Sequence, residues 1–218
     1  MVLKKYFFAL IFVQIASISF SQTIHIRIGP SLSTLFCSNT ITSNIQSNKS
    51  ILGFNGFVGV DYLNLKYFSL SSNIGYVQKG GNDSIIGTTT NSPEGGSYFI
   101  KTKLGYFSVN TTADFKLPIK HVIVLFIHFG PRLDVLVYHN RTHNDLVYLD
   151  ENKGLNNFSY GLLLGGGLNV TIKKIQVGVI FDYYLNINDI SKMSLPETTL
   201  KKVWDKTFTL NLQLGYNL

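Results

Sequence analysis

The last residues of the chain, KTFTLNLQLGYNL, alternate strictly between apolar and polar side chains. The apolar positions are Phe208, Leu210, Leu212, Leu214, Tyr216 and Leu218. A period of two predicts a β-strand with one apolar face. The run is longer than the roughly five or six residues of most soluble strands. It approaches the length of about 9 to 11 residues that a tilted strand needs to cross a bilayer.

The same alternation recurs upstream and predicts about eight strands in all. The further segments are TIHIRIGPSL, GFNGFVGVDYL, YFSLSSNIGYVQKGG, YFIKTKLGYFSVNTTADFKL, LFIHFGPRLDVLV, FSYGLLLGGGLNVTI and IQVGVIFDYYLNIN. The fourth changes phase near Gly105, where we expect a β-bulge or the point at which the strand leaves the membrane. An even strand number is required of closed single-chain outer-membrane barrels. We therefore expect an all-β fold, an eight-stranded antiparallel up-and-down transmembrane β-barrel.

The expected connections alternate between long and short. The long ones are Phe36 to Ser50, Gly80 to Ser97, His139 to Asn156 and Asn188 to Lys206, and the short ones are Leu63 to Lys66, Pro118 to His121 and Lys173 to Lys174. Outer-membrane barrels have short periplasmic turns and longer extracellular loops, which would place both termini in the periplasm. The last strand would pair with the first and leave no free edge in lipid. The alternative is a soluble lipocalin-like barrel, whose apolar side would face inward.

The first residues have the order of a secretory signal peptide. Lys4 and Lys5 precede an apolar run from Tyr6 to Phe20, and the small residues Ser19 and Ser21 follow the pattern of a cleavage site. We expect residues 1–21 to be a signal peptide and residues 22–218 to be the outer-membrane β-barrel domain. The location predicted from this export signal and the strands is the outer membrane of a Gram-negative cell.

Composition supports strands in lipid. Charged residues make up only 14% of the chain and hydrophobic residues 45%, whereas about a quarter of an average soluble domain is charged. The formal net charge of +7 suits contact with outer-membrane lipid and lipopolysaccharide, but the sequence has no basic cluster of the kind that nucleic-acid binding requires. The single cysteine, Cys37, excludes an internal disulfide.

Both signs of charge occur on the faces predicted to point inward. The candidate residues of a structural charge network in the lumen are Arg27, Asp61, Asp114, Arg132, Asp134 and Asp182. Eight strands enclose a space only just wide enough for their own side chains, so a diffusion pore is not expected. Charges in such a space need partners, because an unpaired buried charge is strongly destabilising.

The sequence does not predict catalysis or a cofactor. Some eight-stranded outer-membrane barrels are lipid-modifying hydrolases that pair a histidine with a serine, but this chain has no Gly-x-Ser-x-Gly turn. We expect His128 to be a polar lumen residue and His139 and His143 to be loop residues without a third metal ligand. The glycine run Gly165 to Gly167 lacks the lysine and the helix of a phosphate-binding loop. No catalytic, cofactor or metal site is expected.

Several stretches together carry a resemblance to a known family. They are RIGPSLSTLF, FSLSSNIGYVQKGG, FGPRLDVLV, YGLLLGGGLNV, IFDYYLNINDIS and the closing FTLNLQLGYNL. In this order they resemble the PorT-like outer-membrane β-barrel family of Bacteroidota. One departure from the family is the fourth strand, where FSVNTTADFKL stands in place of the usual proline-containing run. The chain also ends in Leu218 rather than in the terminal aromatic residue that is common in the outer-membrane assembly signal. The resemblance implies outer-membrane location and, for some members, a part in protein secretion.

Three functions are compatible with the sequence. The preferred one is a non-catalytic binding or assembly component that contacts a protein partner through extracellular loops, chiefly Gly80 to Ser97 and His139 to Asn156. The alternatives are a small channel and an outer-membrane lipid-modifying hydrolase.

Overall fold

The computed structural model describes residues 22–38, 45–46, 49–87, 96–119, 122–143, 146–148, 156–190 and 202–218. The expected signal peptide lies outside the described residues, as do parts of the long connections. The strands are β1 (Thr23–Ser38), β2 (Ile45–Gln46), β3 (Ile51–Asn64), β4 (Phe68–Gly87), β5 (Gly96–Pro118), β6 (Ile123–His143), β7 (Leu146–Tyr148), β8 (Phe158–Ile172), β9 (Ile175–Asn186) and β10 (Lys202–Asn217). Within the described ranges, no helix is long and apolar enough to cross a membrane.

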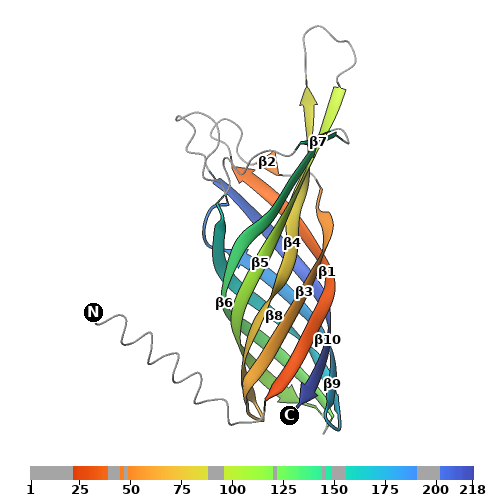
Figure 1. Cartoon of the computed structure of the whole chain (residues 1–218), viewed down its shortest axis with the longest axis vertical. Coiled ribbons are helices and arrows are strands. Elements are labelled where there is room, and N and C mark those ends of the chain that lie inside the picture. The colour runs from red at the N-terminus through yellow and green to blue at the C-terminus, as the bar shows by residue number, and fades with distance from the viewer. Residues whose placement is uncertain are drawn as a thin grey trace, which may run out of the picture.

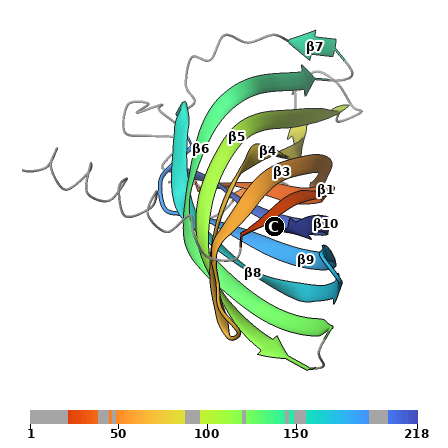
Figure 2. The ribbon, with the colours of Figure 1, turned by 60° about the horizontal axis from the view of Figure 1, so that its bottom comes forward.

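The eight long strands form one closed antiparallel sheet (Figures 1 and 2). Each pairs with the next in the order β1, β3, β4, β5, β6, β8, β9 and β10. Strand β10 then pairs with β1 over its whole length, from Asn217 against Thr23 to Lys202 against Ser38. The short strands β2 and β7 extend β1 and β6. The predicted fold, an eight-stranded up-and-down barrel, is confirmed.

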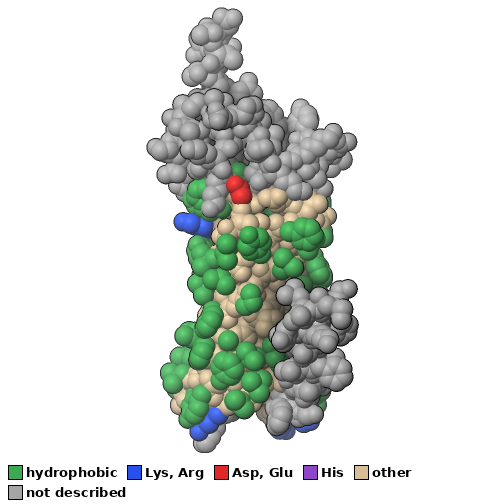
Figure 3. Space-filling model, turned by 90° about the vertical axis from the view of Figure 1, so that its left-hand side faces the viewer, with side chains coloured by type: hydrophobic (Ala, Val, Ile, Leu, Met, Phe, Trp, Pro, Cys, Tyr) green, Lys and Arg blue, Asp and Glu red, His purple; other side chains and the backbone are tan. Residues whose placement is uncertain are grey.

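The alternation in the sequence determines the two faces of the wall. On β10, Leu210, Leu212 and Leu214 are 52%, 63% and 58% exposed, whereas Asn211 and Gln213 between them are at most 3% exposed. Figure 3 shows apolar side chains along the height of the outer wall. Most side chains in the lumen are therefore polar, and most apolar side chains face outward. The soluble barrel with an apolar interior is excluded.

The short connections lie at one end of the barrel, together with Gln22, the first described residue, and the C-terminus (Figure 1). They are Leu65–Tyr67, the connection from β5 to β6 and Lys173–Lys174, and the strand ends that lead into the long connections lie at the opposite end. Lys173 adopts a positive φ of 56° in its two-residue turn, as tight hairpins require. The backbone amide of Asn217 donates to the Lys174 carbonyl and that of Leu218 to Gln22, which holds the end of the chain against this rim. We call these two ends the turn end and the loop end.

The strands β4, β5, β6 and β10 run further into the expected long connections than the sequence indicated. Strand β4 continues to Gly87 and β5 begins at Gly96, so most of the expected loop from Gly80 to Ser97 is a hairpin that extends the wall. The bulge expected near Gly105 is present as a register shift between Gly105 and Tyr106 in the β5–β6 pairing. The β4–β5 pairing has no such shift, so the bulge affects only the pairing of β5 with β6.

Candidate functional site

The lumen holds all six charged residues that the sequence placed there. Each lies on an inward face and is buried, with exposures from 0% for Asp134 to 7% for Asp61. They do not form one continuous network. Side chains from neighbouring strands divide them into a group near the loop end, a group in the middle and a group nearer the turn end.

The group nearest the loop end joins strands that face each other across the lumen. Lys79 Nζ on β4 donates to Asp134 Oδ2 on β6 at 2.9 Å and lies 3.5 Å from Asp205 Oδ2 on β10. Arg132 also donates to Asp134 and reaches Asn186, whose amide in turn donates to Asp205. Two positive and two negative side chains thus meet in balance, as buried charges must.

Two tyrosines close the space around this group. Lys79 Nζ lies 5.1 Å from the ring centre of Tyr106 and 5.3 Å from that of Tyr184, and Arg132 Cζ lies 4.8 Å from the Tyr184 ring. These are distances for cation–π attraction. Both tyrosines belong to a buried apolar cluster that also contains Leu35, Phe57, Val77, Leu104, Leu163 and Ile190. At this level the lumen is filled by side chains rather than open.

A histidine–carboxylate pair forms the middle group. His128 Nε2 donates to Asp182 Oδ1 at 2.7 Å, and the second carboxylate oxygen accepts a hydrogen bond from Asn211 at 3.0 Å. Gly165 lies directly beneath the pair, since a Cβ there would lie 2.4 Å from His128 Nε2 and 2.5 Å from Asp182 Oδ1. The glycine-rich segment of β8 therefore makes room for lumen side chains.

The third group lies nearer the turn end and relies more on neutral partners. Arg27 Nε donates to Gln213 at 2.8 Å, and His25 donates to Asn73 at 2.8 Å while its other ring nitrogen lies 3.5 Å from Asp61. The carboxylate of Asp114 accepts hydrogen bonds from three hydroxyl groups, those of Ser69, Ser71 and Thr112. These charges are satisfied mainly by neighbouring hydroxyl and amide groups.

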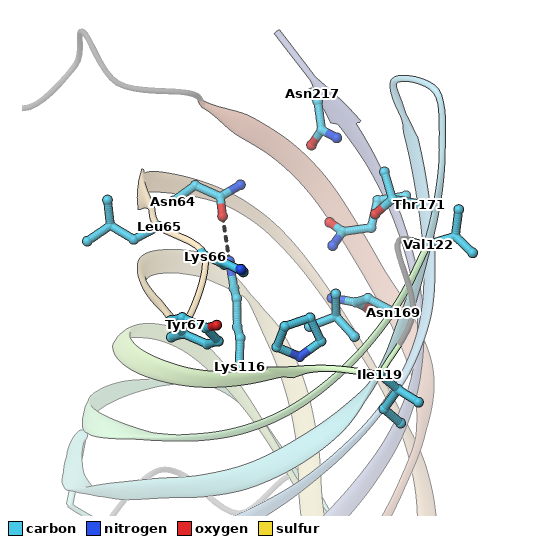
Figure 4. A pocket seen from close by; sticks show the side chains of 13 residues that line it. Asn64, Leu65, Lys66, Tyr67, Lys116, Ile119, Val122, Asn169, Thr171 and Asn217 are labelled. Atoms are coloured by element: carbon cyan, nitrogen blue, oxygen red, sulfur yellow. Dashed lines mark hydrogen bonds between the residues drawn. The ribbon is translucent and has the colours of Figure 1, made fainter.

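Beyond this group the lumen opens at the turn end. The cavity there has a volume of about 1030 Å³ and is lined by residues of β3, β5, β6, β8, β9 and β10 and of two of the short turns (Figure 4). Lys116 projects from β5 and donates to Asn64 across the cavity wall. The cavity opens at the turn end and is closed at its inner end by buried polar side chains.

The predicted charge network left out three members of these groups, namely Lys79, Asp205 and His25. His25 shares the polar face of its strand with Arg27. Lys79 lies in phase with the buried Ser71 and Asn73, and Asp205 with the buried Thr207. Lys79 was assigned to the end of its strand and Asp205 to a loop, although both strands continue past these residues. Extending the period-two pattern along the longer strands would have found both.

The histidines do not assemble a recognisable hydrolytic site among the described residues. A serine triad needs a hydroxyl group at the histidine nitrogen that is not bound to the carboxylate, and the Nδ1 atom of His128 has no hydrogen-bond partner. His139 is only partly buried on β6, and the side chain of His143 lies outside the described residues. Within the described part of the chain, no three His, Cys, Asp or Glu side chains are placed to hold a metal.

A family model described as "Outer membrane protein beta-barrel domain" matches residues 20–192. Among solved structures, the attachment invasion locus protein Ail of Yersinia pestis, in complex with the heparin analogue sucrose octasulfate, is 15% identical with a TM-score of 0.44, and the match covers 90% of this chain and 100% of Ail. Neisserial surface protein A is 11% identical with a TM-score of 0.49 and coverages of 89% and 97%. OprG from Pseudomonas aeruginosa is 10% identical with a TM-score of 0.47 and coverages of 91% and 97%. No curated protein matches the chain.

Proposed function

The chain belongs to the outer membrane protein β-barrel domain family and is an outer-membrane protein, and we propose that it is a non-catalytic binding or assembly component that acts through its extracellular loops. The filled lumen is the observation that carries this proposal. Lys79 and Asp205 lie on strands separated by β3 and β1, so their contact crosses the barrel. A barrel blocked by side chains at this level has no route for a solute, which leaves its ends to interact with other molecules.

The loop end is the better candidate for contact with a protein partner. Outer-membrane barrels place their longer connections outside the cell, and binding residues are disproportionately found on loops held by a rigid scaffold. The β4–β5 hairpin, together with β6, projects beyond the other strands and would hold such loops away from the membrane (Figure 1). The PorT-like resemblance supports a partner in protein secretion across the outer membrane.

The proposal can be tested by replacing loop residues alone, without changing the strands. Because β4 reaches Gly87 and β5 starts at Gly96, residues 88–95 and residues 149–155 would each be replaced by short Gly-Ser segments. The same replacement at residues 191–200 is the matched control. Partners would be captured by cross-linking in whole cells and identified by mass spectrometry. The proposal expects one or both exchanges, but not the control, to abolish capture of a partner that the unchanged protein binds.

Folding of each exchanged barrel would be checked by the mobility shift that a folded barrel shows on a gel before and after boiling. Capture that survives both exchanges in folded protein would rule out binding through these loops.

The proposal that the protein is not a hydrolase is tested by replacing His128 with Asn, which keeps a hydrogen-bonding side chain beside Asp182. Lipid A from cells carrying this variant is expected to match that from cells carrying the unchanged protein. A difference would favour the hydrolase instead.

A further inference from the structure

Lysines that are distant in sequence come together at the turn end. Lys66, Lys173 and Lys174 lie exposed in two of the turns, and Lys116 lies half-buried at the end of β5. The described segments of this rim, residues 62–68, 115–119, 122–124 and 171–176, contain no aspartate or glutamate. The nearest lumen carboxylates, Asp61 and Asp114, lie deeper and are buried. The rim is therefore positively charged, although no segment of the sequence is strongly basic.

The cavity at this end presents hydrogen-bond donors that have no partner. The ammonium group of Lys116 has three N–H donors, and among the described residues only one is used, in the bond to Asn64. The amide oxygen of Asn217 accepts from Thr23 Oγ1 at 2.7 Å, and its amide nitrogen has no partner among the described residues. Both side chains line the same cavity (Figure 4). Free donors beside a positive charge are what a phosphate or carboxylate group requires.

The opposite wall supplies a buried acceptor. Asn169 on β8 lines the cavity and is 7% exposed, and its Oδ1 atom has no hydrogen-bond partner within the described part of the chain. This oxygen packs against β9, 1.9 Å from the place that a Cβ at Gly178 would take. An acceptor buried without a partner is costly. Rotation of the Asn169 amide would turn the oxygen towards the cavity, where a ligand would donate to it from a hydroxyl or amino group. The cavity thus combines a cationic, donor-rich side with one unsatisfied acceptor.

We propose that the turn-end cavity binds a phosphate ester of a small polyol or amino alcohol, with the phosphate at Lys116 and Lys66 and the donor group at Asn169. This binding would occur on the periplasmic side and goes beyond the proposed role of the loops. A soluble glycerol phosphate and the headgroup of a phospholipid in the inner leaflet share this chemistry. The cavity's volume of about 1030 Å³ accommodates either.

The first experiment measures binding of sn-glycerol 3-phosphate and inorganic phosphate to the full chain in maltoside detergent, which carries no phosphate, by isothermal titration calorimetry. The second measures phosphatidylglycerol that stays bound when the protein is released from nanodiscs of phosphatidylethanolamine and phosphatidylglycerol, by native mass spectrometry. Binding in the first assay indicates a soluble ester as the source. Retention in the second without binding in the first indicates a lipid headgroup. Either result supports the proposal only if it depends on Lys116.

Lys116→Met removes the charge and keeps the side-chain length, and Lys206→Met is the matched control at an exposed lysine near the loop end. Loss of a charge-assisted hydrogen bond should weaken binding or retention roughly tenfold or more in the first variant and leave the second unchanged. Asn169→Ala should reduce the difference in affinity between sn-glycerol 3-phosphate and inorganic phosphate. If the Lys116 variant does not fold, the Asn169 variant provides the test instead. Absence of saturable binding and of retention, or equal losses in the Lys116 and Lys206 variants, would overturn the proposal.

Discussion

Lys79 Nζ lies 2.9 Å from Asp134 Oδ2 in the lumen, and neither residue is exposed to solvent. The two residues come from β4 and β6, with β5 between them, and Asp205 on β10 approaches the same ammonium from across the barrel. One lysine thus joins three strands of the wall. Its charge is needed because the two buried carboxylates around it would otherwise have Arg132 as their only described positive neighbour.

Replacement of Lys79 by Met should destabilise the barrel markedly. Removing one member of a buried ion pair leaves the partner charge uncompensated, at a cost of about 3–5 kcal/mol. Urea unfolding of the protein in detergent micelles would measure the free energy of unfolding. Lys66→Met, at an exposed turn lysine, is the control and should have little effect. Equal stability of the two variants would show that the buried pair contributes nothing.

Gly165 should be required because the His128–Asp182 pair and the β9 backbone leave no room for a Cβ atom there. A Cβ there would lie 2.4 Å from His128 Nε2 and 2.5 Å from the Phe181 carbonyl oxygen, whereas at Gly56 on the outer face the nearest atom lies 3.8 Å away. Gly165→Ala should cost about 1–3 kcal/mol through overpacking. Gly56→Ala should change stability by less than about 0.5 kcal/mol. The same urea titration compares them, and a tolerated alanine at position 165 would contradict the placement of the His128–Asp182 pair.

Closure of the wall between β1 and β10 can be tested covalently. Ser33 Oγ and Thr207 Oγ1 lie 2.9 Å apart across this seam, so cysteines at both positions should form a disulfide. The experiment uses Ser33→Cys with Thr207→Cys in a Cys37→Ser background and reads the disulfide as altered mobility of boiled, non-reduced protein. Ser33→Cys with Leu210→Cys is the control, because Leu210 faces outward. Cross-linking in the control but not in the seam pair would contradict the closed register.

The only tryptophan of the chain should lie at the membrane surface. Trp204 stacks on Phe36 with ring centres 5.8 Å apart near the loop end, and Tyr216 lies near the other end of β10. At about 3.3 Å per residue the strand between them is roughly 40 Å long, which at a tilt of about 40° rises roughly 30 Å. This is the thickness of the hydrocarbon core. Lipids brominated near the headgroup should therefore quench Trp204 fluorescence more strongly than lipids brominated deep in the chain; the reverse order would place Trp204 in the hydrocarbon core.

Much of the wall could be predicted because a strand in lipid repeats one simple pattern. Arg132 and Asp134 were assigned to the lumen correctly, since apolar residues flank each of them in strict alternation. The same phase places Leu163 and Ile180 on the inward face, where they are 1% and 0% exposed, although each stands between other apolar residues. Hydrophobicity alone would not separate these two residues from their outward-facing neighbours.

Contacts across the lumen could not be predicted from the sequence. The distance between Lys79 and Asp205 depends on the register shifts between all the strands around the barrel. The total of these shifts cannot be read from any local sequence pattern. The positive rim at the turn end has a similar origin. Its lysines lie in two separate turns and at the end of β5, and only the up-and-down path of the chain brings Lys66, Lys116 and Lys174 to one end.

We propose that the barrel binds a partner rather than conducts solutes, because side chains fill its lumen around Lys79, Tyr106 and Tyr184. The most direct measurement is the electrical conductance of the full mature chain inserted into planar lipid bilayers, with a general porin in the same bilayers as positive control. Insertion would be verified by the heat-dependent gel shift of protein recovered from matched liposomes. We predict no conductance steps from inserted protein. Reproducible steps would show an open path through the lumen and would contradict the account.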